Sequence, residues 1–267
     1  MRDYRLRWIG SDNDPEPTSD IYGHGTAQLA CLLSIAPDVE VFAIKCTEVD
    51  PTTAIKRALE LGVDIISCAW GFDIDQPTTN AKAKKLPRDF KPLHALIQQT
   101  VNTGVCVVAA AGNGQRSFPG CMPEVISAGG AYYGADRNFH PSDLSSVYES
   151  AIFPGRKIPD ICGLTGNLPH GRLLLLPVPP KAQLAKRRGF KAAEGWALLS
   201  GTSAATAMIA GAAALVLQCK PGLPPADVRA LLMQSSKHVE DRQVLDLKEC
   251  FRDYTRITSD DRQGAPA

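Results

Sequence analysis

Apolar runs of strand length alternate with helix-like stretches between residues 40 and 129. The runs at 40–46, 63–68, 105–110 and 125–129 have the composition of buried strands, and the stretches 51–62 and 90–103 have that of helices stopped by glycine. Parallel strands that are covered by helices on both faces read as continuous apolar runs. This order therefore predicts an α/β fold, a three-layer, doubly wound, mostly parallel sheet.

The segment Trp196–Cys219 contains no charged residue and is long enough to span a bilayer. Its middle is rich in alanine and glycine, and its first half carries several serines and threonines. A helix buried on all sides inside a large α/β domain has the same pattern, and we prefer that interpretation. Helices are expected at 203–219 and 225–235, and the proline- and glycine-rich region 137–195 is expected to form loops and hairpins.

Composition points to one globular domain with little electrostatic preference. The 267 residues carry 29 basic and 28 acidic side chains, so no net field favours nucleic acid or an anionic membrane as a partner. We expect a domain over 1–240 and a charged tail over 241–267.

The first residues lack the apolar core of a signal peptide. The chain is expected in the cytoplasm if Met1 is the true start, and outside the cell if upstream sequence is missing. Its oligomeric state cannot be read.

None of the eight cysteines has CxxC spacing, and several lie inside apolar runs. We interpret them as buried free thiols, which hints at a reducing compartment, with disulfides as the open alternative.

Three short motifs carry residues suited to acyl transfer. Gly23-His24-Gly25-Thr26 opens a helical stretch, Ala111-Gly112-Asn113 follows a buried strand, and Gly201-Thr202-Ser203-Ala204-Ala205 opens the apolar helix. An imidazole can act as a base, a carboxamide can donate to an oxyanion, and a hydroxyl at a helix start lies near unpaired N–H groups. Singly, His24 and Ser203 fit helix caps and Asn113 fits a turn. Together, in this order, they favour a catalytic site.

These motifs together resemble those of the subtilisin-like (subtilase) family of serine proteases, over roughly residues 20 to 236. The resemblance implies a subtilisin-like fold in which Ser203 attacks a peptide carbonyl, His24 takes the proton, and Asn113 binds the oxyanion. It also implies that a peptide or protein substrate lies as an extended strand between two segments. Those segments are Ala69, Trp70, Gly71 and Ala110, Ala111, Gly112. Trp70 could equally belong to the core.

The aspartate of the subtilase triad has no counterpart here. In the family it ends the first strand of the sheet, in an Asp-Ser/Thr-Gly motif upstream of the histidine. None of Asp3, Asp12, Asp14 and Asp20 follows a buried strand. The stretch 5–10 resembles what should come after the aspartate, so the peptidase domain is expected to be incomplete at its N-terminus.

Three functions remain open from the sequence. The first is a serine endopeptidase, weak or inactive as this chain. The second is a pseudoprotease or peptide-binding module that keeps the fold. The third, a nucleotide-binding protein using Gly112-Asn113-Gly114, lacks both GxGxxG and GxxxxGKS. No cofactor or catalytic metal is expected. Subtilases often bind structural calcium, but no calcium-loop pattern is visible.

Overall fold

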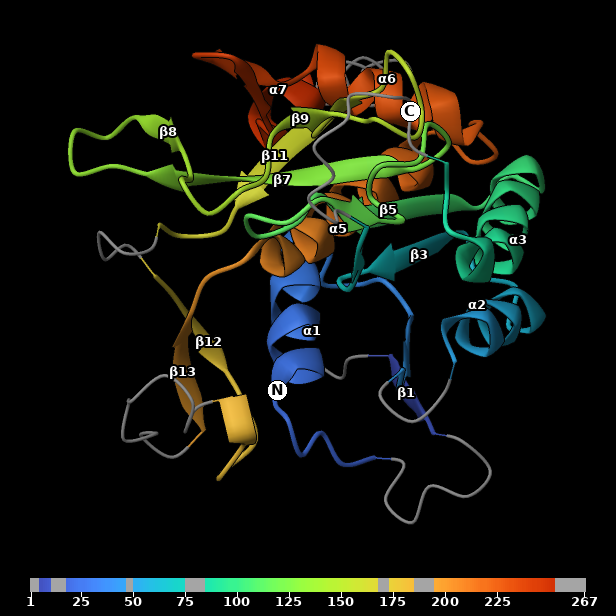
Figure 1. Ribbon diagram of the computed structural model, residues 1–267. Coiled ribbons are helices and arrows are strands. Elements are labelled where there is room, and N and C mark those ends of the chain that lie inside the picture. Colours follow the sequence, from blue (N-terminus) through green and yellow to red (C-terminus); the bar gives the residue numbers. More distant parts are fainter. Residues whose placement is uncertain are drawn as a thin grey trace, which may run out of the picture.

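A computed structural model describes residues 5–10, 18–46, 50–74, 85–167, 173–184 and 195–252. A mostly parallel sheet forms its centre, in the order β14-β15-β11-β7-β5-β3, with β8 attached to β7 (Figure 1). The parallel strands are β3 (Ile65–Cys68), β5 (Cys106–Ala110), β7 (Ile126–Tyr133), β11 (Ile161–Leu164) and β15 (Arg242–Val244). Two strands run antiparallel to their neighbours, β8 (Phe139–Pro141) and β14 (Lys237–Val239). The predicted α/β fold class is confirmed.

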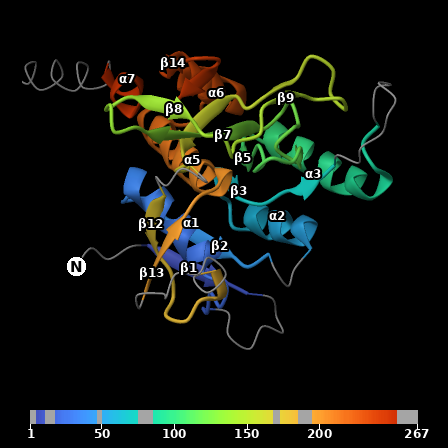
Figure 2. The same cartoon turned by 60° about the vertical axis from the view of Figure 1, so that its left-hand side comes forward.

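Helices cover both faces of this sheet. Side chains alternate across a strand, so Val108 of β5 packs with α5 (Thr202–Cys219) and α6 (Pro225–Gln234), whereas Val107 packs with α2 (Pro51–Glu60) and α3 (Lys91–Asn102). Helix α1 (His24–Ile35) lies against α5 (Figure 2). The two clusters make the three layers that the sequence predicts.

Helix α5 is the apolar helix of Trp196–Cys219, and it is long and apolar enough to meet the criterion for a membrane span. In the structure 61% of its residues are buried, against α1 and strands of the sheet. Gly163 of β11 allows close packing, because a Cβ there would lie 3.0 Å from the Cα of Ala205. The core-helix interpretation therefore accounts for its composition.

The helices on the opposite face begin and end where their sequences indicate. Asp50 accepts the N–H of Thr53, and Pro51 occupies the first turn of α2, where its missing N–H costs nothing. Gly62 and Gly104 follow α2 and α3 with positive φ angles of 69° and 98°, which glycine adopts without strain. Helix α3 is preceded by the 3₁₀ turn η1 (Arg88–Phe90).

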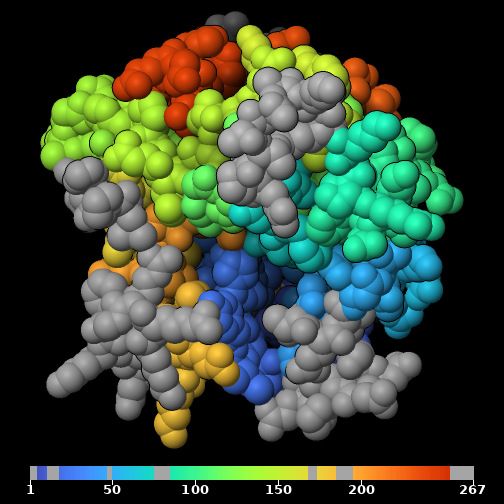
Figure 3. All heavy atoms as spheres, in the orientation of Figure 1, coloured from blue at the N-terminus to red at the C-terminus, as the bar shows by residue number. Residues whose placement is uncertain are grey.

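A second, smaller sheet stands apart from the first. Its strands β1 (Leu6–Ile9) and β2 (Val41–Ile44) run parallel. Within the described residues β2 pairs with β1 alone, and β3 pairs with β5 alone. Between β2 and β3 lies a cavity of about 700 Å³. Figure 3 shows the surface hollowed between the blue helix α1 and the light-blue helix α2.

Two stretches differ from expectation. Residues 242–250, expected to belong to a charged tail from 241, instead form β15 and the short helix α7 (Leu247–Cys250), and Val244 is 1% exposed. The expected loop region 137–195 contains the central strand β11. Short pairs complete the fold: β4 (Phe72–Asp73) with β6 (Ser117–Phe118), β9 (Tyr148–Glu149) with β10 (Lys157–Ile158), and β12 (Leu174–Pro177) with β13 (Trp196–Leu199).

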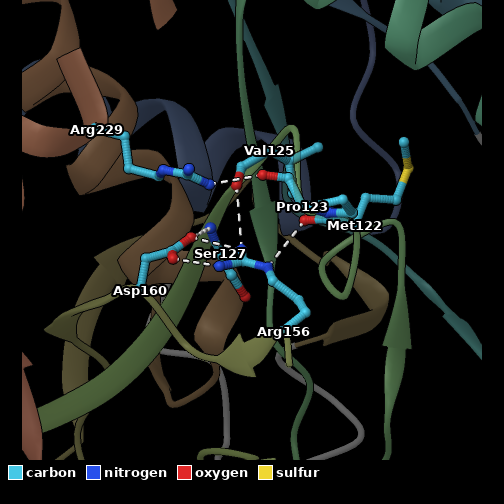
Figure 4. A network of polar contacts seen from close by, with 7 residues as sticks. All are labelled: Met122, Pro123, Val125, Ser127, Arg156, Asp160 and Arg229. Atoms are coloured by element: carbon cyan, nitrogen blue, oxygen red, sulfur yellow. Dashed lines mark hydrogen bonds and ion pairs between the residues drawn. The ribbon is translucent and has the colours of Figure 1, made fainter. Parts of the chain in front are cut away.

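A buried ion pair in the segment before β11 is hydrogen-bonded to the segment that leads into β7 (Figure 4). The guanidinium of Arg156 makes two contacts with the carboxylate of Asp160, and the side chains are 11% and 6% exposed. Arg156 also donates to the carbonyl oxygens of Met122 and Val125, and Asp160 accepts the N–H of Ser127. The network holds the two loops together.

Candidate active site

Ser203 is the second residue of α5, at the carboxyl edge of the sheet. Its hydroxyl donates to the carbonyl oxygen of Ala69, 2.9 Å away, just after β3. The N–H of Ser203 is among the first four of the helix, which have no intrahelical acceptor. The residue thus combines a hydroxyl with an N–H at the positive end of a helix dipole.

Asn113 lies beside the start of the same helix. Its Oδ1 accepts the N–H of Thr202 at 2.8 Å and the Thr202 hydroxyl at 3.1 Å. The carboxamide oxygen is therefore occupied by the residue before Ser203, and the amide NH₂ is left as the donor group. The structure brings together two of the three predicted residues, Asn113 and Ser203.

The loop that carries Asn113 is fixed by its neighbours. Gly112 has a φ of 117°, and a Cβ there would lie 2.2 Å from the carbonyl oxygen of Gln115. The hydroxyl of Ser146 donates to that same oxygen at 2.6 Å and accepts the N–H of Gly114 at 2.9 Å. Only glycine fits at position 112, and the hydrogen bonds of Ser146 hold this loop against the segment around residue 146.

His24 begins α1, and the carboxylate of Asp20 lies beside it. Asp20 accepts the N–H of Gly23 at 2.8 Å and the N–H and hydroxyl of Thr26 at 2.7 and 2.8 Å. Asp20 thus caps the helix start, where N–H groups and the dipole favour a negative charge. Burial lowers the pKa of His24 below its usual value, and the charge of Asp20 opposes that shift. The lowered pKa favours the neutral ring, the form that a general base requires.

His24 makes no hydrogen bond to Asn113 or Ser203 among the described residues. A Cβ on Gly23 would lie 2.7 Å from the Cβ of Ala182, so the start of α1 lies beside the segment after β12. Helix α1 also packs against α5: a Cβ on Gly211 would lie 2.9 Å from the carbonyl oxygen of Leu32, and Ala27 and Cys31 share a buried cluster with Ala204 and Ala207. In Figure 1 the lower end of α1 lies next to β12 and β13. Within the described part of the chain, no hydrogen bond connects His24 with Ser203.

The first expected wall of the substrate cleft, 69–71, follows β3. Gly71 is exposed, and a Cβ there would lie 1.9 Å from the Oγ of Ser117, so any larger residue would force the Ser117 side chain to move. Trp70 packs edge-on against Phe72, with ring centroids 5.8 Å apart, and also lines the cavity between β2 and β3. Its side chain belongs to the core and to the cavity wall together.

The facing wall, 110–112, is closed to side-chain contact. Ala110 and Ala111 are 5% and 0% exposed, and a Cβ on Gly120 would lie 2.1 Å from the carbonyl oxygen of Ala110. The chain around Gly120 therefore packs directly on this segment.

Neither a triad carboxylate nor a metal cluster is found in the part of the chain that the structure describes. Asp20 lies there, but its oxygens accept three helix-start donors; Asp3, Asp12 and Asp14 lie outside the described residues. In the same described ranges, no three histidine, cysteine, aspartate or glutamate side chains converge.

Comparison with known proteins gives one family. The sequence model of the subtilase family matches residues 4–265. A Paenibacillus polymyxa protein described as an intracellular serine protease is 26% identical over 247 residues, which is 81% of this chain and 62% of that protein. The serine protease AprX of Bacillus subtilis is 30% identical over 159 residues, 56% of this chain and 34% of AprX. The chain thus spans less than two thirds of these curated relatives.

Solved structures show the same fold. The crystal structure of a lanthipeptide protease superposes with a TM-score of 0.69 at 18% identity, covering 94% of this chain and 82% of that chain. The nisin leader peptidase NisP from Lactococcus lactis gives 0.65 at 18% identity, covering 93% and 82%. At these identities the likeness concerns the arrangement of helices and strands.

Proposed function

Because this chain belongs to the subtilase family, we propose that it is a serine endopeptidase that cleaves peptide bonds through an acyl-enzyme. The observation that carries the proposal is the start of α5. There Asn113 is bound to Thr202, and Ser203 presents its hydroxyl and its N–H. A nucleophile next to two oxyanion donors is the core of acyl-transfer chemistry.

In the proposed reaction the Ser203 Oγ bonds to the scissile carbonyl carbon and gives its proton to His24. The amide NH₂ of Asn113 and the N–H of Ser203 donate to the oxyanion. His24 then protonates the leaving amine, and a water molecule hydrolyses the ester in the same way. Apart from the substrate and this water molecule, only the chain's own side chains and backbone groups take part. The Ser203 hydroxyl must leave Ala69 O, and His24 must approach from the start of α1.

A fluorophosphonate probe tests this proposal, because it reacts with an activated serine and needs no known substrate. We expect labelling at Ser203 that is abolished in Ser203→Ala. Ser200→Ala is the matched control. Ser200 lies three positions before Ser203, and its hydroxyl has no hydrogen-bond partner among the described residues. Labelling that persists in Ser203→Ala contradicts the proposal.

The lack of a hydrogen bond between His24 and Ser203 in the described part of the chain favours a second candidate, a peptide-binding module that keeps the subtilase fold. This function needs the backbone of 69–71 and the sheet edge but no proton transfer. A chain that captures an extended peptide yet leaves Ser203 unlabelled at every pH between 5 and 9 would support this candidate over the peptidase.

We also propose that the protein works in a reducing compartment. All eight cysteines are unpaired, six of them are buried, and burial raises the pKa of Cys31 to about 12. Buried thiols of this kind behave as small apolar residues. The melting temperature is expected to be the same with and without dithiothreitol, and a fall on reduction would contradict a reducing site of action.

A further inference from the structure

A second pocket, of about 770 Å³, lies beside the start of α3. Its walls come from two parts of the chain that are far apart in sequence, 85–94 and 152–153, and it shares no lining residue with the cavity between β2 and β3. Its volume falls in the range of ligand pockets, about 300–1,000 Å³. The proposed peptidase chemistry uses none of its residues.

One wall of this pocket is basic. Its polar members follow one another at intervals of three residues: Lys85, Arg88, Lys91 and His94. In a 3₁₀ turn the side chains at i and i+3 eclipse, and in an α-helix they are neighbours on one face. The turn η1 and the first turn of α3 therefore present Arg88, Lys91 and His94 to the same side.

The three cations of this wall are exposed, and within the described residues they form no ion pair. By contrast, Arg57 at the end of α2 pairs with Glu60. The first turn of α3 contains no acidic residue, and Asp89, the one acidic residue of 85–94, does not line the pocket. Like charges at such short spacing repel each other, so an anionic ligand would stabilise the wall.

His94 is the least exposed member of the row. Its ring stacks on that of Phe153, with centroids 5.6 Å apart and an interplanar angle of 20°. Its Nε2 is buried and has no hydrogen-bond partner in the part of the chain that the structure describes. Buried polar atoms in folded proteins are almost always paired, and an unpaired one costs free energy. This atom is a mark of a ligand site that is independent of the charges.

The rest of the pocket is lined by apolar side chains. They are Leu86, Ile152 and Phe153, and all three are partly buried. Leu86 and Phe153 pack on the hydrophobic cluster beneath α3, so this wall is fixed to the core. A phosphate ion would leave the apolar wall uncovered. The pocket fits a ligand that carries both an apolar group and negative charge.

The basic wall lies near the continuation of the expected substrate cleft. Phe90 stands in the chain between Arg88 and Lys91, and its ring packs on Phe72 with centroids 5.1 Å apart. Phe72 is exposed and follows the cleft wall 69–71 directly. A peptide that lies along 69–71 and continues past Phe72 would therefore approach the cations of the pocket.

We propose that this pocket binds an acidic segment of a polypeptide, in which carboxylates flank an aromatic or large aliphatic side chain. The carboxylates would accept hydrogen bonds from Arg88 and Lys91, and the planar guanidinium suits a carboxylate that binds with both oxygens. The apolar side chain would lie on Ile152 and Phe153. Nucleic acid is a poorer fit, because it requires a longer track of cations and the chain carries a net charge of only +1.

The pocket would then select substrates, a consequence that rests on the proposed function. A polypeptide held at Ser203 and at the pocket together must carry its acidic residues several positions away from the scissile bond. The chemical step at Ser203 needs no contact with the pocket. Binding and cleavage can therefore be measured separately.

Binding is measured by fluorescence anisotropy with a fluorescein-labelled peptide of sequence Glu-Asp-Phe-Glu-Asp-Leu. We expect saturable one-to-one binding. The amide peptide Gln-Asn-Phe-Gln-Asn-Leu lacks the charges, and Glu-Asp-Gly-Glu-Asp-Gly lacks the apolar groups. Both are expected to bind about five-fold more weakly or less. Equal binding of either control peptide overturns the proposed ligand chemistry.

Two double variants with the same change in net charge test the basic wall. Arg88→Gln with Lys91→Gln is expected to weaken binding about five-fold or more. Lys56→Gln with Lys248→Gln, at exposed positions of α2 and α7, should bind as the unchanged chain does. An equal loss in both would mean that only overall charge matters and would overturn the site. Near-ultraviolet circular dichroism checks that each variant folds.

His94→Phe tests the inner end of the pocket, because it keeps a ring against Phe153 and removes Nε2. We expect weaker binding of the acidic peptide and an unchanged melting temperature. Unchanged binding would contradict the contact between the ligand and this histidine.

Photochemical cross-linking locates the bound peptide. With benzoylphenylalanine in place of its phenylalanine, the acidic peptide is expected to label 85–94 and 152–153, as read by mass spectrometry. Labelling confined to other segments overturns the proposal. So does displacement of the peptide by inorganic phosphate or by oligothymidylate at equal ionic strength, since either result would make the pocket a phosphate site.

Cleavage of a peptide library separates this inference from the proposed function. Its members carry a randomised stretch flanked on either side by Asp-Phe-Glu or by Asn-Phe-Gln. We expect faster cleavage of the acidic members, and loss of this preference in Arg88→Gln with Lys91→Gln. Binding without any cleavage or Ser203 labelling supports the pocket and contradicts the peptidase. Equal cleavage of both kinds of member contradicts the selection of substrates by the pocket.

Discussion

The hydroxyl of Ser203 is hydrogen-bonded to the carbonyl oxygen of Ala69, a residue 134 positions earlier in the chain. This bond joins the first turn of α5 to the end of β3, the strand at the edge of the main sheet. The serine is thereby fixed to the sheet edge before any substrate binds. Attack on a peptide requires the Ser203 hydroxyl to turn away from this carbonyl. A peptide lying along 69–71 could then take the place of the hydroxyl as the hydrogen-bond partner of the Ala69 carbonyl.

Asn113→Asp is expected to separate catalysis from stability at the start of α5. The aspartate keeps an oxygen that accepts from Thr202 but lacks the NH₂ that would bind the oxyanion. The rate of Ser203 labelling by fluorophosphonate should fall by about 10²–10³, a loss seen for such a donor in a member of this family. The free energy of unfolding, measured in urea, should change by less than about 1 kcal/mol. A decrease in the labelling rate of less than about three-fold would contradict the role of Asn113 as an oxyanion donor.

Asp20→Asn is expected to shift the pH dependence of labelling. The charge of Asp20 raises the pKa of His24 against the larger effect of burial. Its removal lowers that pKa further, so the neutral base persists to lower pH and the acid limb of the rate profile moves to lower pH. Measurement of labelling rates from pH 4 to 8 checks the direction. An acid limb that moves to higher pH would show that Asp20 does not act on the ring.

The same histidine makes stability depend on pH. Because its folded pKa lies below the unfolded value, the unfolded state binds the proton more tightly, and the free energy of unfolding falls as the pH drops below the unfolded pKa. We expect His24→Gln to reduce this loss between neutral and mildly acid pH, as read from urea titrations. His238→Gln is the control, since His238 lies on the exposed strand β14. Equal slopes in His24→Gln and the unchanged chain would contradict the assignment.

Arg156→Met should destabilise the fold strongly. It leaves the buried carboxylate of Asp160 without its ion partner, which typically costs about 3–5 kcal/mol. Arg57→Met removes the exposed pair with Glu60, where the side chains are 52% and 63% exposed, and should cost less than about 1 kcal/mol. Chemical denaturation of the two variants measures the difference. Similar costs would mean that the Arg156 pair is hydrated.

Gly163→Ala tests the close packing of β11 on α5. The new Cβ would lie 3.0 Å from the Cα and 3.1 Å from the Cβ of Ala205, and overpacking of this kind costs about 1–3 kcal/mol. Gly25→Ala is the control, because its Cβ would find an ordinary distance of 3.4 Å to the Asp20 carboxylate. Thermal unfolding distinguishes the two. An unchanged melting temperature in Gly163→Ala would show that α5 can shift outward freely.

The alternating centre of the fold could be predicted because each element carries its own local signal. Continuous apolar runs indicated β3 and β5, and Pro51, Gly62 and Gly104 indicated the ends of helices. Strand β11 was missed because it is short and follows a region of prolines and glycines. Strand β15 was missed because its single buried residue, Val244, follows two polar residues, Arg242 and Gln243, so no apolar run indicates a strand. In both cases tertiary pairing, not local pattern, makes the strand.

The candidate site was predictable as a set of motifs but not as an assembly. The sequence indicates Asn113 and Ser203, and the structure brings them together through Thr202. Their roles and that of His24 stay predictions. The capping role of Asp20 had a signal, a carboxylate a few residues before a glycine-flanked helix start. No sequence signal indicated the cavity between β2 and β3, because an unfilled position in a sheet produces no recognisable pattern in the residues around it.

The position of β15 beside β11 has a consequence for synthesis on the ribosome. Val244 pairs with Cys162, so one flank of β11 stays open while some 80 further residues are made after Leu164. At translation speeds of about 5–20 residues per second this delay is roughly 4–16 s. The emerging polypeptide therefore carries an unfinished sheet for seconds, and a chaperone that shields such an edge would raise the yield of folded protein.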